Sequence, residues 1–282
     1  MSHTGLPPAT DADLARVCEA LAMITPRWNM RVLLALSGPP TRYTETARKV
    51  SWLSNSKVHL VLRNLCDAGL VQRTEHDARH VTYAHTDRAT TLLPVLPVIA
   101  AWAEQYLEPK QPLPAIDQIE DSLTLLTRRH AAPILWTLKI RGETSGRALA
   151  RTVMPDRNWT NIYPPLRQLV ADGLVDTDGT GHPYRLSVSG EGLGRVFGAL
   201  SAWAAGQPLT QAARHPVWGR QTTAQGPRAW VSHQNQNPAP AARTAVAVGP
   251  PTDRTAWNST DLFSHAVPAR PTPALPTGGI RR

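Results

Sequence analysis

The chain has 282 residues, 41% of them hydrophobic, so it is long enough to bury a core as one or two domains. It contains no apolar run of about eighteen residues, and its first residues lack the basic and apolar stretches of a signal peptide, so we expect a cytoplasmic protein with no membrane partner. The net charge is +9, but residues 205–282 hold eight basic and two acidic side chains. The positive charge therefore predicts mainly non-specific attraction of this segment to polyanions.

Two cysteines, Cys18 and Cys66, are too few for a disulfide framework, and no Cys/His cluster has the spacing of zinc ligands. We therefore expect no metal and no cofactor. The chain also lacks a GxSxG motif, an HExxH motif and a phosphate-binding loop. These absences favour a binding protein over an enzyme.

In chain order, apolar residues at three-and-four spacing predict helices in the first third of the chain, and alternating residues then predict two strands. Ser54 suits the N-cap of the fourth helix, and Gly69 suits its C-terminal stop. The expected elements are helices at 11–24, 28–36, 44–50 and 55–68, and strands at 70–74 and 80–84 around a candidate wing at 75–79.

This order of elements is that of a winged helix-turn-helix domain. Residues 88–107 add a closing helix that Pro94 and Pro97 are expected to split or kink. The closing helix is strongly apolar, so it must bury its surface through dimerisation or by docking on another part of the chain.

The chain repeats itself. Residues 65–71 match residues 169–175 at an offset of 104, and two further pairs of segments match at offsets of 102 and 101. We therefore predict a mainly α fold with small β-hairpin wings, built as two tandem winged helix-turn-helix domains. The expected boundaries are domain 1 at 10–108, a Pro-rich linker at 109–116, a divergent domain 2 at 117–205, and a disordered Arg/Pro-rich tail at 206–282.

The first repeat resembles the HxlR-type family of bacterial winged-helix regulators. The resemblance rests on Pro26-Arg27-Trp28, on residues 38–45, on Leu53-Ser54, on residues 62–73 and on Trp102-Ala103. It implies sequence-specific binding of double-stranded DNA by a dimer, with the fourth helix in the major groove and the wing near the backbone or the minor groove. The DNA-contact candidates that this assignment selects are Arg42, Ser54, Asn55, Ser56, Lys57, His59, Arg63, Arg79 and His80.

The second repeat departs from this pattern. His130 stands where the first repeat has Trp28, and Pro164-Pro165 falls inside the expected recognition helix, which would then begin only at Pro164. The expected wing, residues 176–181, is short and acidic. Weaker DNA-contact candidates here are Arg157, Asn158, Thr160, Asn161 and Arg167.

Three questions remain open: the oligomeric state, a redox role and the class of function. The protein is expected either to form a homodimer or to act as an intramolecular pseudo-dimer in which the second repeat serves as the mate of the first. Some members of the family that the first repeat resembles sense oxidants through a cysteine before the second helix, so the resemblance makes Cys18 a candidate redox sensor, provided that its thiol has a low pKa and is accessible. The rival function is a protein–protein interaction adaptor built on degenerate winged helices, whose tail binds a further protein.

Overall fold

The computed structural model describes residues 4–77, 80–107 and 113–219. Arg79, residues 109–112 of the expected linker and residues 220–282 of the expected tail lie outside this described part. We refer to residues 8–106 as the first half and to residues 115–204 as the second half. In the described part, no helix is long and apolar enough to cross a membrane.

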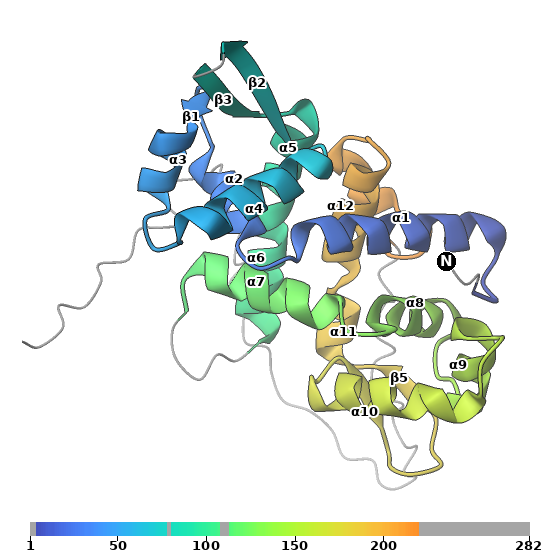
Figure 1. Cartoon of the computed structure of the whole chain (residues 1–282). Helices are drawn as coiled ribbons and strands as arrows, with labels where there is room; N and C mark the ends of the chain where they lie inside the picture. The colour runs from blue at the N-terminus through green and yellow to red at the C-terminus, as the bar shows by residue number, and fades with distance from the viewer. Residues whose placement is uncertain (1–3, 78–79, 108–112, 220–282) are drawn as a thin grey trace, which may run out of the picture.

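The first half runs through helices, a hairpin and a closing pair of helices (Figure 1). Its three-stranded antiparallel sheet has the order β1-β3-β2. Its elements are α1 (Pro8–Ile24), α2 (Asn29–Ala35), β1 (Thr41–Arg42), α3 (Tyr43–Lys49), α4 (Asn55–Asp67), β2 (Val71–Asp77), β3 (His80–His85), α5 (Asp87–Leu92), the 3-10 helix η1 (Leu93–Val95) and α6 (Leu96–Tyr106).

The second half follows a similar order, with shorter strands in its hairpin. Its two strands pair antiparallel, and an isolated bridge takes the place of β1. Its elements are α7 (Ala115–Leu126), α8 (Ala131–Arg141), α9 (Gly146–Val153), the 3-10 helix η2 (Trp159–Ile162), α10 (Tyr163–Ala171), β4 (Val175–Thr177), β5 (Tyr184–Leu186), α11 (Val188–Gly192) and α12 (Gly194–Ala204).

The expected elements of the first half are present, with shifted ends. The first helix begins at Pro8 instead of residue 11, because Pro7 and Pro8 suit the entry and first position of a helix. The expected closing helix is divided into α5, η1 and α6 around its two prolines. The strand expected to stop at residue 74 continues to Asp77, because β3 pairs with it as far as Asp77, across an irregularity between Glu75 and Asp77.

Small local features recur in the two halves. The Thr86 and Ser187 hydroxyls each accept a hydrogen bond from a backbone amide three residues ahead, and so cap α5 and α11. The same hydroxyls donate to Gly69 O at 2.7 Å and to Gly173 O at 2.6 Å. Thr41 pairs with Tyr83 as Thr144 pairs with Tyr184.

The residue before the second helix adopts the same unusual conformation in both halves. Trp28 has φ 76° and precedes α2, and His130 has φ 62° and precedes α8. In the described part they are the only non-glycine residues with positive φ. Because this conformation is costly for a side chain with a Cβ, the shared geometry supports the alignment of His130 with Trp28.

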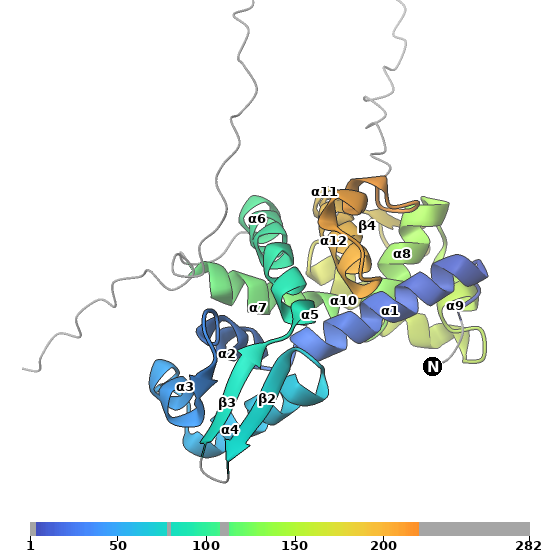
Figure 2. The same cartoon turned by 90° about the horizontal axis from the view of Figure 1, so that it is seen from above.

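The two halves pack together through equivalent elements. Figure 2 shows α6 and α12 in the middle of the molecule, between α2–α4 on the left and α8 and α9 on the right, with α1 running from the middle toward α9. Helix α6 packs against α7, and α12 packs against α1. Trp102 Nε1 donates to Ser189 O at 3.0 Å, and Trp203 Nε1 donates to Arg88 O at 2.9 Å. Donors and acceptors are each 101 positions apart, so the interface makes the same contact twice, as an isologous dimer does.

Residues 206–219, expected to be disordered, are ordered and pack on α12. The 3-10 helix η3 (Leu209–Arg214) is followed by Trp218, which is buried against Phe197 and Trp136. His215 Nδ1 accepts the backbone N–H of Trp218 at 3.0 Å, so the proton is on Nε2, which faces Asp13 Oδ2 at 2.7 Å. The expected tail boundary at residue 206 was therefore wrong, because the apolar partners of Trp218 lie far away in sequence.

The boundary between linker and second half also shifts. Helix α7 begins at Ala115, inside the expected linker, because Pro114 precedes it and its buried side starts at Ile116. In the second half, the residues just before the expected helix start at Pro164 form η2 from Trp159, and α10 begins at Tyr163 so that Pro164 and Pro165 occupy its first turn. Prolines are tolerated there because first-turn amides have no partner within the helix.

Candidate nucleic-acid interface

Helix α4 is held against the core by one apolar side. Val58, Val61, Leu62 and Leu65 are buried at the spacing of one helical face and pack toward α2. The start of the helix is fixed to α3 because the Tyr43 hydroxyl donates to Asn55 O at 2.8 Å. The opposite side of α4 is therefore presented to solvent in a defined orientation.

The polar candidates of the first half lie together on that solvent side of α4. Arg63 lies 3.9 Å from Asp67, and both side chains are largely exposed, so this ion pair restrains Arg63 only weakly. Ser54 occupies the N-cap position, but its hydroxyl faces Ser56 Oγ at 3.3 Å and does not cap a backbone amide. The exposed candidates on α4 and at its cap are Ser54, Asn55, Ser56, Lys57, His59 and Arg63.

Arg42 lies at the entrance to α3. Its side chain is exposed, and its backbone N–H donates to Glu45 at 3.2 Å. Thr41 and Arg42 pair with Tyr83 and Thr82 of β3, so Arg42 sits beside the hairpin. The sheet therefore brings Arg42 close to the wing.

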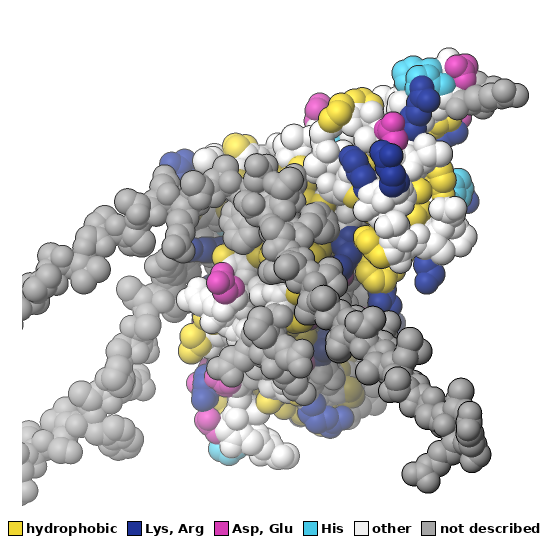
Figure 3. All heavy atoms as spheres, turned by 90° about the vertical axis from the view of Figure 1, so that its left-hand side faces the viewer, with side chains coloured by type: hydrophobic (Ala, Val, Ile, Leu, Met, Phe, Trp, Pro, Cys, Tyr) yellow, Lys and Arg dark blue, Asp and Glu magenta, His cyan; other side chains and the backbone are white. Residues whose placement is uncertain are grey.

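The hairpin carries mixed polar groups toward its tip. His80 is half-buried, and its ring centroid lies 4.7 Å from that of His76, whose Nε2 is 3.1 Å from Thr82 Oγ1. Arg73 forms an ion pair with Glu75 on the exposed strand β2. Figure 3 shows a group of His side chains at its upper right end, with an acidic side chain beside it and Lys or Arg side chains below it.

A cluster of tryptophan and arginine next to α4 is absent from the sequence-based candidates. The Trp52 ring is 48% exposed and lies 5.0 Å from that of Trp28. The Arg27 guanidinium lies 4.3 Å from the centroid of Trp28, within the range of a cation–π contact. The signal available in the sequence was an aromatic residue two positions before the N-cap Ser54.

The corresponding surface of the second half has a different chemistry. Aligned at the offset of 104, Trp159 takes the place of Asn55, Asn161 that of Lys57 and Arg167 that of Arg63. Trp159 is 45% exposed, and its ring lies 5.9 Å from the Arg147 guanidinium. The weaker candidates Arg157, Asn158, Thr160, Asn161 and Arg167 are all exposed.

The hairpin of the second half is largely self-neutralised. Arg185 donates to both carboxylate oxygens of Asp178, at 2.9 and 3.2 Å. Hydrogen bonding to Arg185 lowers the pKa of Asp178, so this carboxylate stays charged and keeps Arg185 occupied. The acidic turn therefore lacks the basic excess that attracts phosphate.

The structure argues against Cys18 as a redox sensor. Its side chain is half-buried on α1, and burial raises the pKa of its thiol to about 11. A sensing cysteine needs an accessible thiolate near neutral pH. Burial therefore disfavours a thiolate at Cys18 near neutral pH, and the redox role stays a prediction.

Within residues 4–77, 80–107 and 113–219, no three His, Cys, Asp or Glu residues lie together in a way that could hold a metal ion. The described candidates of the first half form one surface: the solvent-exposed face of α4, flanked by Arg42 and the hairpin. This arrangement offers hydrogen-bond donors and positive charge to a ligand that is itself elongated.

The HxlR-like helix-turn-helix family matches this chain over residues 23–111. An uncharacterized HTH-type transcriptional regulator from Halalkalibacterium halodurans is 32% identical over 85 residues, which make up 29% of this chain and 75% of that protein. No solved structure matches. The matched region contains α2, α4, the hairpin and α6, and the chain therefore belongs to the HxlR-like helix-turn-helix family.

Proposed function

We propose that this protein is a sequence-specific DNA-binding transcriptional regulator whose α4 enters the major groove. The observation that carries the proposal is the exposed polar side of α4, held rigidly by a buried apolar side within the family-matched region. The printed description of the Halalkalibacterium halodurans relative as an HTH-type transcriptional regulator supports the same function. A rigid helix with polar side chains near its N-terminus suits recognition of base edges.

The side chains of α4 divide into two kinds of contact. Asn55 offers an amide that can pair with adenine, while Lys57 and Arg63 can pair with guanine or phosphate. Arg42, His80 and Arg79 are proposed to contact the phosphate backbone, which sets position and salt dependence but carries no sequence information. Specificity is therefore assigned to the helix and general affinity to its flanks.

We further propose that the second half is a divergent winged helix-turn-helix unit that serves as the dimerisation mate of the first. The reciprocal contacts of Trp102 and Trp203 support this proposal, as does the shared conformation of Trp28 and His130. One chain would then take the place of a homodimer. Because the second unit has a different exposed surface, its operator would be asymmetric.

The test uses DNA sites selected from a random library by the full-length protein. Arg63→Ala and Lys57→Ala are expected to weaken binding to the selected site by about tenfold or more. Arg195→Ala is the matched control, since Arg195 is an exposed arginine on α12. Failure to enrich any sequence, or equal losses in all three variants, would contradict specific binding by α4.

Stoichiometry tests the pseudo-dimer. We expect the free protein to sediment as a monomer and one chain to occupy each selected site. Two chains per site, arranged symmetrically on a palindrome, would show that two first halves form the reading dimer and that the pseudo-dimer proposal is wrong.

The adaptor function remains the second candidate because the second half has an exposed aromatic surface around Trp159. Trp159 is 45% exposed and its ring contacts that of Tyr163, whereas polar side chains occupy the equivalent positions of α4. Exposed aromatic side chains are enriched at protein–protein interfaces. If Trp159→Ala leaves DNA binding unchanged while Arg63→Ala abolishes it, the surface around Trp159 is open to a protein partner.

A further inference from the structure

The packed helices α1 and α7 correspond residue by residue. Their buried side chains match at an offset of 102, as Leu14 with Ile116 and Leu21 with Leu123. The same offset aligns Trp28 with His130 at the start of the next helix. Any contact made at one side of the interface therefore has a defined counterpart at the other side.

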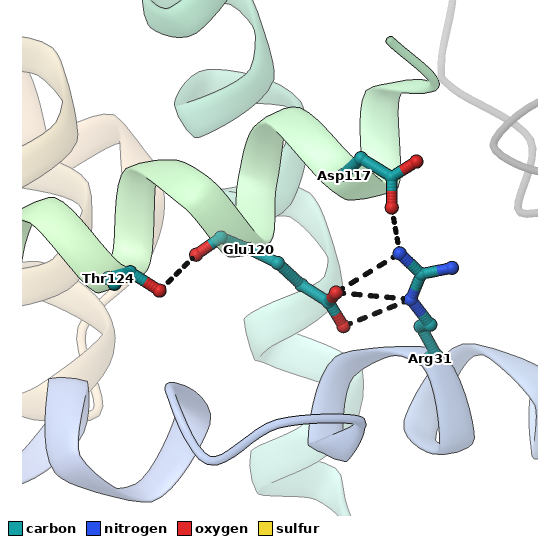
Figure 4. Close-up of polar contacts among 4 residues, drawn as sticks. All are labelled: Arg31, Asp117, Glu120 and Thr124. Carbon is teal, nitrogen blue, oxygen red and sulfur yellow. Dashed lines mark hydrogen bonds and ion pairs between the residues drawn. The ribbon is translucent and has the colours of Figure 1, made fainter. Parts of the chain in front are cut away.

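One side of the interface is closed by an ion-pair cluster. Arg31 of α2 forms ion pairs with Asp117 and Glu120 of α7 (Figure 4). Its Nε lies 3.1 Å from both carboxylate oxygens of Glu120. The Arg31 side chain is only 20% exposed, so the cluster fills the space between the two helices.

On the other side, the equivalents of all three charged residues are uncharged and smaller. At the offset of 102, Pro133 replaces Arg31, Ala15 replaces Asp117 and Cys18 replaces Glu120. A hollow of about 490 Å³ lies here between α1 and the start of α8, and both Cys18 and Pro133 line it. Two of the three uncharged equivalents, Cys18 and Pro133, therefore border open space, whereas their counterparts Glu120 and Arg31 form an ion pair.

The floor and the rim of this hollow differ in chemistry. Leu21 of α1, Leu126 of α7 and Ala132 of α8 are buried and form apolar walls contributed by both halves. Arg128, Arg129 and His130 also line it, and Arg128 is already paired with Asp172. Burial lowers the pKa of His130, with further lowering by Arg129 and Arg157.

We propose that this hollow binds a small organic anion that has an apolar body and a single carboxylate or similar acidic group. The body would lie over the apolar walls, and the acidic group would pair with Arg129, whose side chain is exposed at the rim. The volume falls within the range of about 300–1,000 Å³ that is usual for small-molecule sites. Such a ligand would touch both halves at once and would stabilise their association.

The test uses two fluorescent probes with the same apolar body. 1-Anilinonaphthalene-8-sulfonate carries one negative charge, and N-phenyl-1-naphthylamine carries none. Titration of the full-length protein without DNA is expected to give one site that prefers the anionic probe. Arg129→Gln should weaken binding of the anionic probe by about fivefold to tenfold and leave the neutral probe unchanged.

A second variant restores the missing cluster. The combination Ala15→Asp, Cys18→Glu and Pro133→Arg reproduces the charges found on the other side, and it should fill the hollow and remove binding of both probes. Circular dichroism checks that this variant is folded. If the triple variant does not fold, the proposal is tested by the effect of Arg129→Gln on binding of the two probes.

Unchanged probe binding in the folded triple variant would overturn the proposal, and so would equal effects of Arg129→Gln on both probes. Because the titrations contain no DNA, their outcome is independent of whether α4 binds DNA. Failure of the anion site and failure of the proposed function are therefore distinguishable.

Discussion

Replacing the two interface tryptophans by phenylalanine tests whether the halves are joined as equivalent partners. Trp102 and Trp203 are each 3% exposed and each donate one hydrogen bond to a backbone carbonyl of the other half. Phenylalanine removes that donor, at a cost of about 1 kcal/mol in the free energy of unfolding. The smaller ring also leaves a cavity, which adds roughly 1–2 kcal/mol.

The expected result is a loss of about 2–3 kcal/mol for Trp102→Phe and for Trp203→Phe, measured by urea unfolding followed with circular dichroism. Trp136→Phe is the matched control. Trp136 is fully buried, and its Nε1 has no hydrogen-bond partner among the described residues, so phenylalanine costs it only the ring volume.

The difference from the control isolates the two hydrogen bonds. Trp102→Phe and Trp203→Phe should each exceed Trp136→Phe by about 1 kcal/mol. If only one exceeds it, the interface is not used symmetrically. If neither does, these bonds do not hold the halves together, and the argument for a pseudo-dimer loses its main support.

Three further predictions concern other parts of the chain. Trp218→Ala should lower the free energy of unfolding, measured with urea, by about 3–5 kcal/mol. Trp218→Phe should lower it by clearly less, because the buried Nε1 of Trp218 has no hydrogen-bond partner among the described residues. Burial opposes ionisation of Asp13, but hydrogen bonds from His215 and Ser201 hold its pKa below 3.8. The contribution of the Asp13 carboxylate to the free energy of unfolding is therefore complete above pH 3.8 and is lost as the pH falls through the lowered pKa. Unfolding measured from pH 6 down to about pH 2 should show this loss in the wild type and not in Asp13→Asn, and equal slopes would refute it. Alkylation of Cys18 by iodoacetamide, located by mass spectrometry, should be slow at neutral pH and rise until about pH 11, whereas fast reaction at pH 7 would restore the redox hypothesis.

Much of the local structure could be predicted from the sequence. Helical spacing in residues 55–68 separated a buried side of α4 from an exposed side, and the structure shows this division. Pro94 and Pro97 indicated the break in the closing helix, and Pro164 indicated a late start for α10. These predictions succeeded because helix periodicity, caps and prolines act within a few residues.

The candidate site was predicted only in part. The exposed polar residues of α4 follow from its periodicity, but Trp52 was missed because exposure of an aromatic residue depends on what packs over it. The same limit applies to Cys18, whose position on α1 was clear while its raised pKa depends on burial by other elements. Whether the exposed face binds DNA stays a prediction.

Long-range pairing was decided by the tertiary structure alone. The acceptors of Trp102 and Trp203 lie 87 and 115 residues away in the chain, and the carboxylate facing His215 lies 202 residues away. The sequence by itself indicated the helices and the hairpin of the first half, their order, and an internal repeat. The structure decided how the halves pack, that residues 206–219 pack on α12, and that Arg31 forms ion pairs while Pro133 borders a hollow, because these depend on which surfaces meet in space.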